Sequence, residues 1–103
     1  MSWIKVGHES DLAVGEMKQI SMEEEDLALY HIEEGFFATS DVCTHAAQSL
    51  SQGTLQGAVV ACPRHGGKFD VRTGQPTAFP CVIPIATYPV EIRDGEIWID
   101  YDE

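Results

Sequence analysis

The stretch CTHAAQSLSQGTLQGAVVACPRH, residues 43–65, decides the fold, because its two ends carry the side chains of a complete metal-ligand set. These side chains are two thiols and two imidazoles, Cys43, His45, Cys62 and His65. Between them, Gln56 and Gly57 predict a tight turn, since glycine adopts the backbone angles that turns require. A hairpin at this turn would bring the two ends side by side, so the sequence predicts one metal centre built from two loops.

The pairing of the ligands separates two kinds of metal centre. Structural zinc sites of the Cys2His2 type place the two cysteines in one short pair and the two histidines in another. Here each pair is mixed, as Cys-x-His and Cys-x-x-His. Mixed pairs favour two metal atoms with different ligands, both thiolates at one end and both imidazoles at the other. A [2Fe-2S] centre divided in this way is the Rieske arrangement.

Length, composition and charge limit the class of protein. A chain of 103 residues is too short for two independent cores, so we expect a single domain over residues 1–103. A hydrophobic fraction of 44% argues against a disordered chain. The net charge of -11, from 17 acidic and 6 basic residues, excludes nucleic acid as a partner, because phosphate backbones are bound through Lys and Arg.

The cysteines and the apolar runs indicate a compartment. No basic and then apolar leader precedes Trp3, and no run approaches the roughly 20 apolar residues that cross a bilayer. Three cysteines, an odd number, cannot all pair within the chain, and two of them stand in metal-ligand spacing. We therefore expect a monomer in the cytoplasm that does not associate with membranes.

Short strands account for most of the remaining sequence. Residues 27–32 and 36–39 predict two strands joined by a short glycine-containing loop. Residues 85–93 and 96–101 predict a second hairpin, with Asp94-Gly95 as its tight turn.

Other segments extend this pattern. Residues 3–6 and 17–22 predict further strands, and residues 9–13 predict one helical turn begun by Ser10. Five prolines at positions 63–89 restrict the second half to loops, strand ends and edge strands. No segment has a long 3.6-residue period, so the predicted fold class is all-β, a small antiparallel sandwich or barrel.

The two metal-ligand motifs are specific enough in combination to indicate a family. Cys43-Thr-His45 and Cys62-Pro-Arg-His65, followed by GGKFD at 66–70, resemble the two cluster-binding motifs of Rieske proteins. The segment FDVRTGQPTAFPCVIPIATYPVEI, residues 69–92, resembles the one that follows these motifs in the small Rieske ferredoxins of bacterial aromatic-ring-hydroxylating dioxygenase systems. The resemblance extends over essentially the whole chain.

This resemblance implies a fold, a cofactor and partners. The implied fold is the Rieske fold, a β-sandwich base with an inserted cluster-binding subdomain at about residues 41–84. The implied cofactor is one Rieske-type [2Fe-2S] cluster, with one iron held by two thiolates and the other by two imidazoles, from Cys43, Cys62, His45 and His65. The implied role is that of a one-electron carrier and not an enzyme. It would connect an NAD(P)H-dependent flavoprotein reductase to a terminal Rieske oxygenase.

Departures from the high-potential Rieske pattern predict a low reduction potential. The respiratory Rieske subunits carry an additional cysteine in each loop, joined as a disulfide, and the matching positions here are Gln48 and Arg64. Those proteins also place a serine and a tyrosine as hydrogen-bond donors to the cluster sulfurs, where this chain has Gly67 and Phe69. Fewer donors stabilise the reduced, more negative cluster less. We expect a potential of about -150 mV, the lower part of the range for Rieske centres.

Two alternatives to the shuttle remain open from the residues. One is a Rieske-like small subunit held permanently in a nitrite reductase, and the other is a zinc-binding structural module. The third cysteine, Cys81, is predicted to be a buried thiol with no ligand role. Three of the six basic residues, Arg64, Lys68 and Arg72, lie near the second motif. They would form either a loop whose charges are balanced by nearby acids or a basic rim for docking.

Overall fold

The computed structural model describes residues 2–43, 48–63, 66–79 and 81–101. Strands dominate this part of the chain, with two short 3-10 turns (η) among them. The elements are β1 (Trp3–His8), η1 (Glu9–Asp11), β2 (Met17–Ser21), β3 (Asp26–Ile32), β4 (Gly35–Ser40), η2 (Leu50–Gln52), β5 (Thr54–Gln56), β6 (Val59–Ala61), β7 (Lys68–Asp70), β8 (Pro76–Ala78), β9 (Thr87–Tyr88), β10 (Val90–Arg93) and β11 (Glu96–Asp100). In the described residues, no helix is long and apolar enough to cross a membrane.

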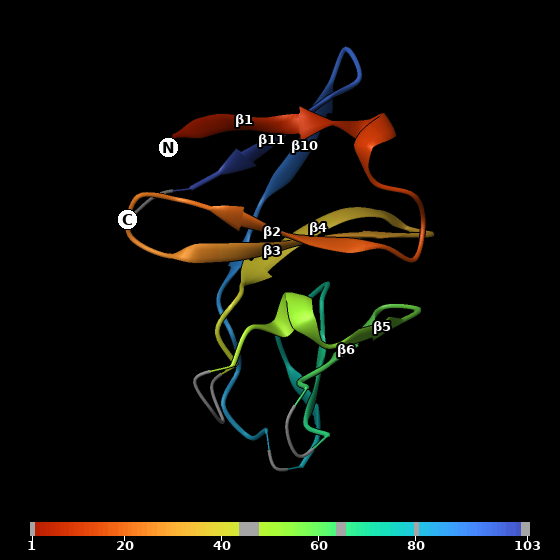
Figure 1. Cartoon of the computed structure of the whole chain (residues 1–103), viewed down its shortest axis with the longest axis vertical. Helices are drawn as coiled ribbons and strands as arrows, with labels where there is room; N and C mark the ends of the chain where they lie inside the picture. The colour runs from red at the N-terminus through yellow and green to blue at the C-terminus, as the bar shows by residue number, and fades with distance from the viewer. Residues whose placement is uncertain (1, 44–47, 64–65, 80, 102–103) are drawn as a thin grey trace.

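The strands form three antiparallel sheets, which confirms the predicted all-β fold. The first sheet has the order β1-β11-β10, the second β2-β3-β4-β9 and the third β5-β6-β7-β8. Figure 1 shows the three sheets following one another along the long axis of the molecule, with β1 and β10 towards one end and β5 and β6 towards the other. Of the predicted metal ligands, Cys43 and Cys62 pack with Val60 of β6 and Phe69 of β7 in the third sheet.

β3 is the strand that joins the layers. Its large apolar side chains occupy successive positions, so both faces of the strand are buried. Leu27 and Leu29 pack on one side in a cluster with Ile99 of β11. Tyr30 packs on the other side in a second cluster with Phe69 of β7. The third sheet and the first sheet are therefore both packed against the same central strand.

The two predicted hairpins are present, with one boundary corrected. β3 and β4 pair as expected, and the turn between β10 and β11 has positive φ angles of 51° at Asp94 and 79° at Gly95. The prediction of one continuous strand over residues 85–93 is wrong. Proline has no N–H for a ladder, so the chain divides at Pro89. β9 pairs with β4 in the second sheet, and β10 pairs with β11 in the first.

The helical turn near the N-terminus is shorter than predicted. It is the three-residue element η1, and Ser10 lies inside it instead of beginning it. The carboxylate of Asp11 accepts a hydrogen bond from the backbone N–H of His8 at 3.0 Å. His8 therefore occupies the N-cap position that the sequence predicts for Ser10.

Candidate metal centre

Cys43 and Cys62 each lie where a loop begins, and the backbone N–H of each closes that loop with a hydrogen bond. The Cys43 N–H donates to the carbonyl of Gln48 at 2.9 Å, across the loop that leaves β4. The Cys62 N–H donates to the carbonyl of Gly67 at 2.7 Å, across the loop between β6 and β7. Both bonds span the same number of residues, so the two loops close in the same way. An antiparallel bridge between Val42 and Ser49 continues the closure of the first loop.

The hairpin of β5 and β6 holds the two loops next to each other. Its turn falls at the predicted position, and Gly57 there has a φ of 60°. Thr54 pairs with Ala61, the residue before Cys62, while the chain before Thr54 leads back through η2 to the first loop. The local turn signal in the sequence thus predicts how the two motifs meet.

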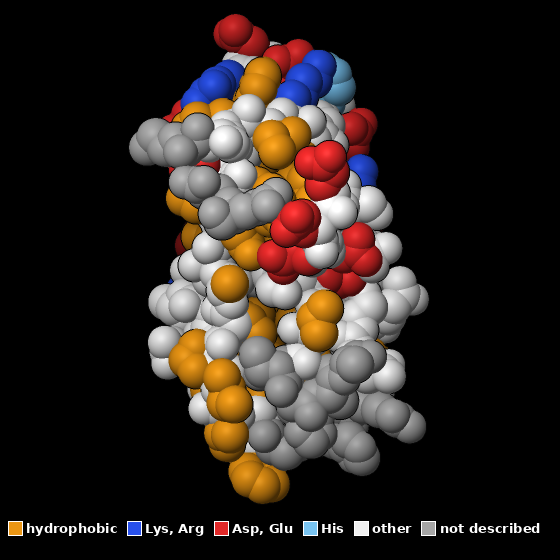
Figure 2. Space-filling view, turned by 90° about the vertical axis from the view of Figure 1, so that its left-hand side faces the viewer, with side chains coloured by type: hydrophobic (Ala, Val, Ile, Leu, Met, Phe, Trp, Pro, Cys, Tyr) orange, Lys and Arg blue, Asp and Glu red, His pale blue; other side chains and the backbone are white. Residues whose placement is uncertain are grey.

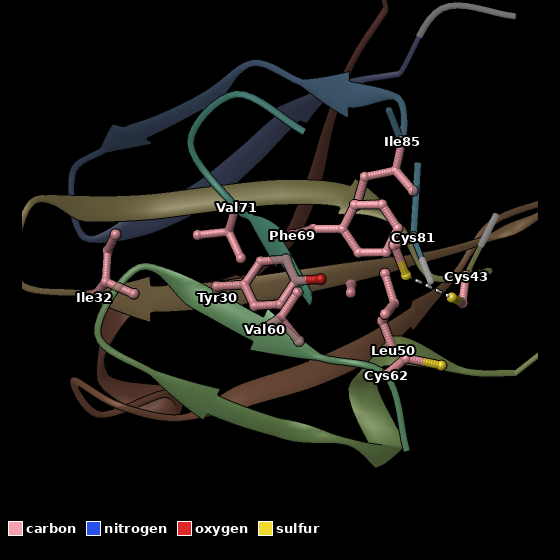
Figure 3. Packing of buried hydrophobic residues seen from close by; sticks show 11 residues of the cluster. Tyr30, Ile32, Cys43, Leu50, Val60, Cys62, Phe69, Val71, Cys81 and Ile85 are labelled. Carbon is pink, nitrogen blue, oxygen red and sulfur yellow. Dashed lines mark hydrogen bonds between the residues drawn. The ribbon is translucent and has the colours of Figure 1, made fainter. Parts of the chain in front are cut away.

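Both cysteines are buried at one end of an apolar cluster. Cys43 is 2% exposed and Cys62 is 4% exposed. Figure 3 shows their sulfurs, with that of Cys81, gathered at one end of the cluster, beyond Leu50 and Phe69. Soft thiolates shielded from water are ligands for iron–sulfur clusters. The donor set on the described residues therefore fits the thiolate half of a [2Fe-2S] site.

The other two predicted ligands, His45 and His65, lie outside the described residues. Within the described ranges, no group of three or more His, Cys, Asp and Glu side chains is arranged to hold a metal ion. The structure therefore brings together the two predicted thiol ligands, and the imidazole half of the site stays a prediction.

Cys81 is buried, as predicted, and it contacts the first loop. Its side chain is 3% exposed, and its Sγ lies 3.7 Å from Sγ of Cys43. Burial, and then the neighbouring Cys43, raise the pKa of the Cys81 thiol to about 12. No disulfide joins any two of the three cysteines, all of which lie in the described residues.

Asp41 is a structural residue of the site that the sequence did not reveal. Its carboxylate is 1% exposed and accepts three hydrogen bonds. These come from the Ser51 N–H at 2.8 Å, from the Gln19 side-chain amide of β2 at 2.8 Å, and from the Ser49 hydroxyl. Its backbone carbonyl also accepts from the Leu50 N–H at 2.7 Å. Asp41 thus fixes both sides of the first loop to the second sheet.

The one sequence signal for this role is the pattern Asp-Val-Cys followed by Ser49 and Ser51, and a single sequence does not show that these side chains meet. Burying a carboxylate is costly unless it is hydrogen-bonded. The three donors to Asp41 compensate this cost and fix the conformation of the loop.

Of the basic residues near the second motif, Arg72 is paired with acidic side chains. Arg72 binds the carboxylate of Asp70 at 2.9 Å and that of Glu34 at 2.8 Å. Its hydrogen bonds hold the pKa of Asp70 below the usual range. Lys68 is exposed, and Arg64 lies outside the described residues. The charge of Arg72 is balanced within the chain, as the alternative of a solvated loop predicts.

Comparison with known proteins identifies the family. The model of the Rieske [2Fe-2S] domain matches residues 2–89. The chain belongs to this family, and its cofactor is a Rieske-type [2Fe-2S] cluster. This confirms the family and the cofactor predicted from the two motifs, and it excludes the zinc-binding module.

Individual relatives agree over nearly the whole chain. Ferredoxin CarAc of Metapseudomonas resinovorans is 42% identical over 94% of this chain and 92% of the relative. The ferredoxin component of the naphthalene 1,2-dioxygenase system of Pseudomonas putida is 38% identical over 97% of this chain and 96% of the relative.

Solved structures give the same result. A chain in the complex of reduced oxygenase and oxidized ferredoxin in carbazole 1,9a-dioxygenase superposes with a TM-score of 0.91 at 42% identity, covering 94% of this chain and 91% of that one. A putative nitrite reductase small subunit has a TM-score of 0.80 at 22% identity, over 98% of this chain and all of that one, and this shows a shared fold alone.

Replacing Asp41 by Ala tests its role in holding the first loop. The change removes the acceptor of three hydrogen bonds, from the Ser51 N–H, the Gln19 amide and the Ser49 hydroxyl, so we expect the free energy of unfolding to fall by about 1–3 kcal/mol. The visible absorbance of the cluster should also bleach faster in the presence of an iron chelator. Glu24→Ala, which removes an exposed carboxylate, is the matched control. Equal stability and equal bleaching rates in the two variants would contradict this role.

Proposed function

We propose that this chain carries single electrons from an NAD(P)H-dependent flavoprotein reductase to the terminal oxygenase of an aromatic-ring-hydroxylating dioxygenase system. The proposal rests on one observation above all: two buried thiols, Cys43 and Cys62, lie at matching positions in two loops of a Rieske-family chain. The relatives that match it over nearly their whole length are ferredoxin components. The chain is an electron-transfer component and not a catalytic subunit of the oxygenase.

Four residues hold the cluster in this proposal, Cys43, His45, Cys62 and His65. Cys43 and Cys62 are both buried, so they would bind one iron as thiolates shielded from water. The two histidines replace two further thiolates by neutral imidazoles, which removes negative charge from the centre and raises its potential above that of an all-cysteine cluster. When bound, the cluster stores one electron.

We also propose how the chain is organised. It is a cytoplasmic monomer folded as one domain over residues 1–103, with the cluster-binding subdomain at about residues 41–84. The third sheet, η2 and both thiol ligands fall within that subdomain. A net charge of -11 supports the monomer, because copies of the chain repel one another.

An apolar surface next to Cys81 supports docking of a partner at the cluster end. Phe79 is 84% exposed, Val82 65% and Ile83 59%, although Cys81 between them is buried. Figure 2 shows hydrophobic side chains gathered at the lower end of the molecule, while the Asp and Glu side chains on that face lie higher up. Exposed apolar patches of this kind mark interaction sites. A short-lived complex formed there would exclude water between the two redox centres.

Substitution of the apolar surface tests the docking site. Phe79→Ser combined with Val82→Ser should raise the ferredoxin concentration needed for half-maximal oxygenase turnover about tenfold, because exposed anchors supply much of the binding energy. The reduction potential should stay unchanged. Val14→Ser, at a position 56% exposed in the chain segment before β2, is the control. A double variant that behaves like this control would show that the partner docks elsewhere.

His45→Cys tests the assigned ligands. An anionic thiolate in place of a neutral imidazole disfavours reduction, so the variant should have a lower reduction potential or lose the cluster. The matched control is His8→Cys, which adds a cysteine at an exposed position and should change neither the spectrum nor the potential. A His45→Cys protein with the original spectrum and potential would remove His45 from the ligand set.

Stepwise reconstitution tests the shuttle itself. Anaerobic mixing with NADH and a flavoprotein reductase should reduce the chain by one electron, and oxidised terminal oxygenase should then reoxidise it in a rapid second phase. The same preparation should elute as a free monomer. A chain that purifies in a stable assembly with a nitrite reductase and fails to reduce the oxygenase would support the alternative.

A further inference from the structure

Cys81 contacts the first cluster loop at a defined distance. Its Sγ lies 3.7 Å from Sγ of Cys43, which is within the range of a sulfur hydrogen bond. The side chain of Cys81 is 3% exposed, although Phe79 and Val82 beside it are among the most exposed hydrophobic residues described. The covering segment therefore turns this one side chain inward, against a predicted ligand.

Cys81 also contacts the second loop, at Gly67. A Cβ atom on Gly67 would lie 2.2 Å from Sγ and 3.3 Å from Cβ of Cys81, and no side chain tolerates the first of these distances. Gly67 has no left-handed φ, so glycine is required here by space and not by backbone angle. The same residue accepts the hydrogen bond from the Cys62 N–H. The sulfur of Cys81 therefore fills the gap between the two loops.

We propose that the Cys81 thiol donates a hydrogen bond to the Cys43 thiolate, and that residue 67 is glycine because this sulfur occupies the space beside it. The inference rests on the proposed ligand set, in which Cys43 binds iron. A ligating cysteine has lost its proton, whereas an ordinary thiol keeps its proton at pH 7. The direction of the bond is thereby fixed, from Cys81 to Cys43.

The bond affects the redox equilibrium. Reduction adds one negative charge to the cluster and its thiolate ligands, and a donor stabilises that charge more in the reduced state than in the oxidised state. Cys81 therefore raises the reduction potential above the value the same site would have without it. Cys81 is a positioning residue, because it acts through Cys43.

The contact with Gly67 explains one departure from the high-potential pattern. A serine at position 67 would place its side chain where the Cys81 sulfur lies. The chain can hold a donor at residue 67 or at residue 81, but not at both. The weaker thiol donor takes the place of a hydroxyl, which agrees with a potential in the lower part of the Rieske range.

Protein-film voltammetry of three variants of the cluster-loaded protein tests the hydrogen bond. Cys81→Ala removes the donor, so at a fixed electrode potential its ratio of reduced to oxidised protein should fall about three- to tenfold, where tenfold corresponds to 59 mV for one electron. Cys81→Ser keeps a donor and should shift less than Cys81→Ala. Val60→Ala, which opens a cavity in the same apolar cluster without removing a polar group, should stay within about twofold of the original ratio.

A double-mutant cycle tests the contact with Gly67 without reference to the potential. Gly67→Ala alone should lower the midpoint of thermal unfolding strongly, since its Cβ meets the sulfur. Gly67→Ala combined with Cys81→Ala should unfold at a higher temperature than Gly67→Ala alone. Additive losses in the double variant would overturn the inferred contact.

The outcomes separate this inference from the proposed ligand set. Cys81→Ala with an intact Rieske spectrum and an unchanged potential overturns the hydrogen bond and leaves the ligands as proposed. Cys81→Ala that remains folded but loses its iron makes Cys81 a ligand, which overturns both. Cys43→Ser with an unchanged spectrum removes Cys43 from the ligand set. A shifted potential in Cys81→Ala with a smaller shift in Cys81→Ser supports the inference.

Discussion

The buried carboxylate of Asp41 is the interaction on which the first half of the metal centre depends. It receives donors from β2 and from the segment that begins η2, so it ties both sides of the Cys43 loop to the second sheet. With Gln48 and Arg64 in place of cysteines, no disulfide joins the cluster loops, and the hydrogen bonds to Asp41 hold the first loop to the second sheet. Each bond is modest by itself, but the cost of leaving a buried carboxylate unpaired makes the arrangement specific.

The layers of the fold explain why the centre lies at one end of the molecule. β3 is buried on both faces, so one apolar cluster connects it to the first sheet and another to the third. The second cluster ends in three sulfurs, from Cys43, Cys62 and Cys81. The base therefore holds the thiolate half of the site in an apolar environment. Hydrogen-bond donors there stabilise a negative charge more strongly than they would in water. The exposed residues Phe79, Val82 and Ile83 lie next to Cys81 in the chain, at the same end of the molecule.

Local signals allowed much of this arrangement to be predicted. The turn at Gly57, the β3–β4 hairpin and the mixed ligand pairs all depend on residues close together in the sequence, and the family followed from the motifs. The prediction of one strand over residues 85–93 is wrong, because the two sides of Pro89 pair in different sheets, and only the break at the proline itself has a local signal.

Contacts between distant parts of the chain could not be predicted. The role of Asp41 depends on donors from β2 and η2, and a single sequence does not show that these segments meet. The sequence predicts that Cys81 is buried, but its position between Cys43 and Gly67 depends on how the segment around it folds back. In the sequence Gly67 is a missing hydrogen-bond donor, and in the structure its lack of a side chain makes room for the sulfur of Cys81.

The central claim is that two histidines and two cysteines share the ligation of one [2Fe-2S] cluster. Electron–nuclear double resonance of the reduced protein, prepared with ¹⁵N-labelled histidine, tests this claim most directly. The account predicts hyperfine couplings from two histidine nitrogens, and the loss of one of them in His45→Cys with the cluster retained. A reduced cluster without histidine couplings would contradict it.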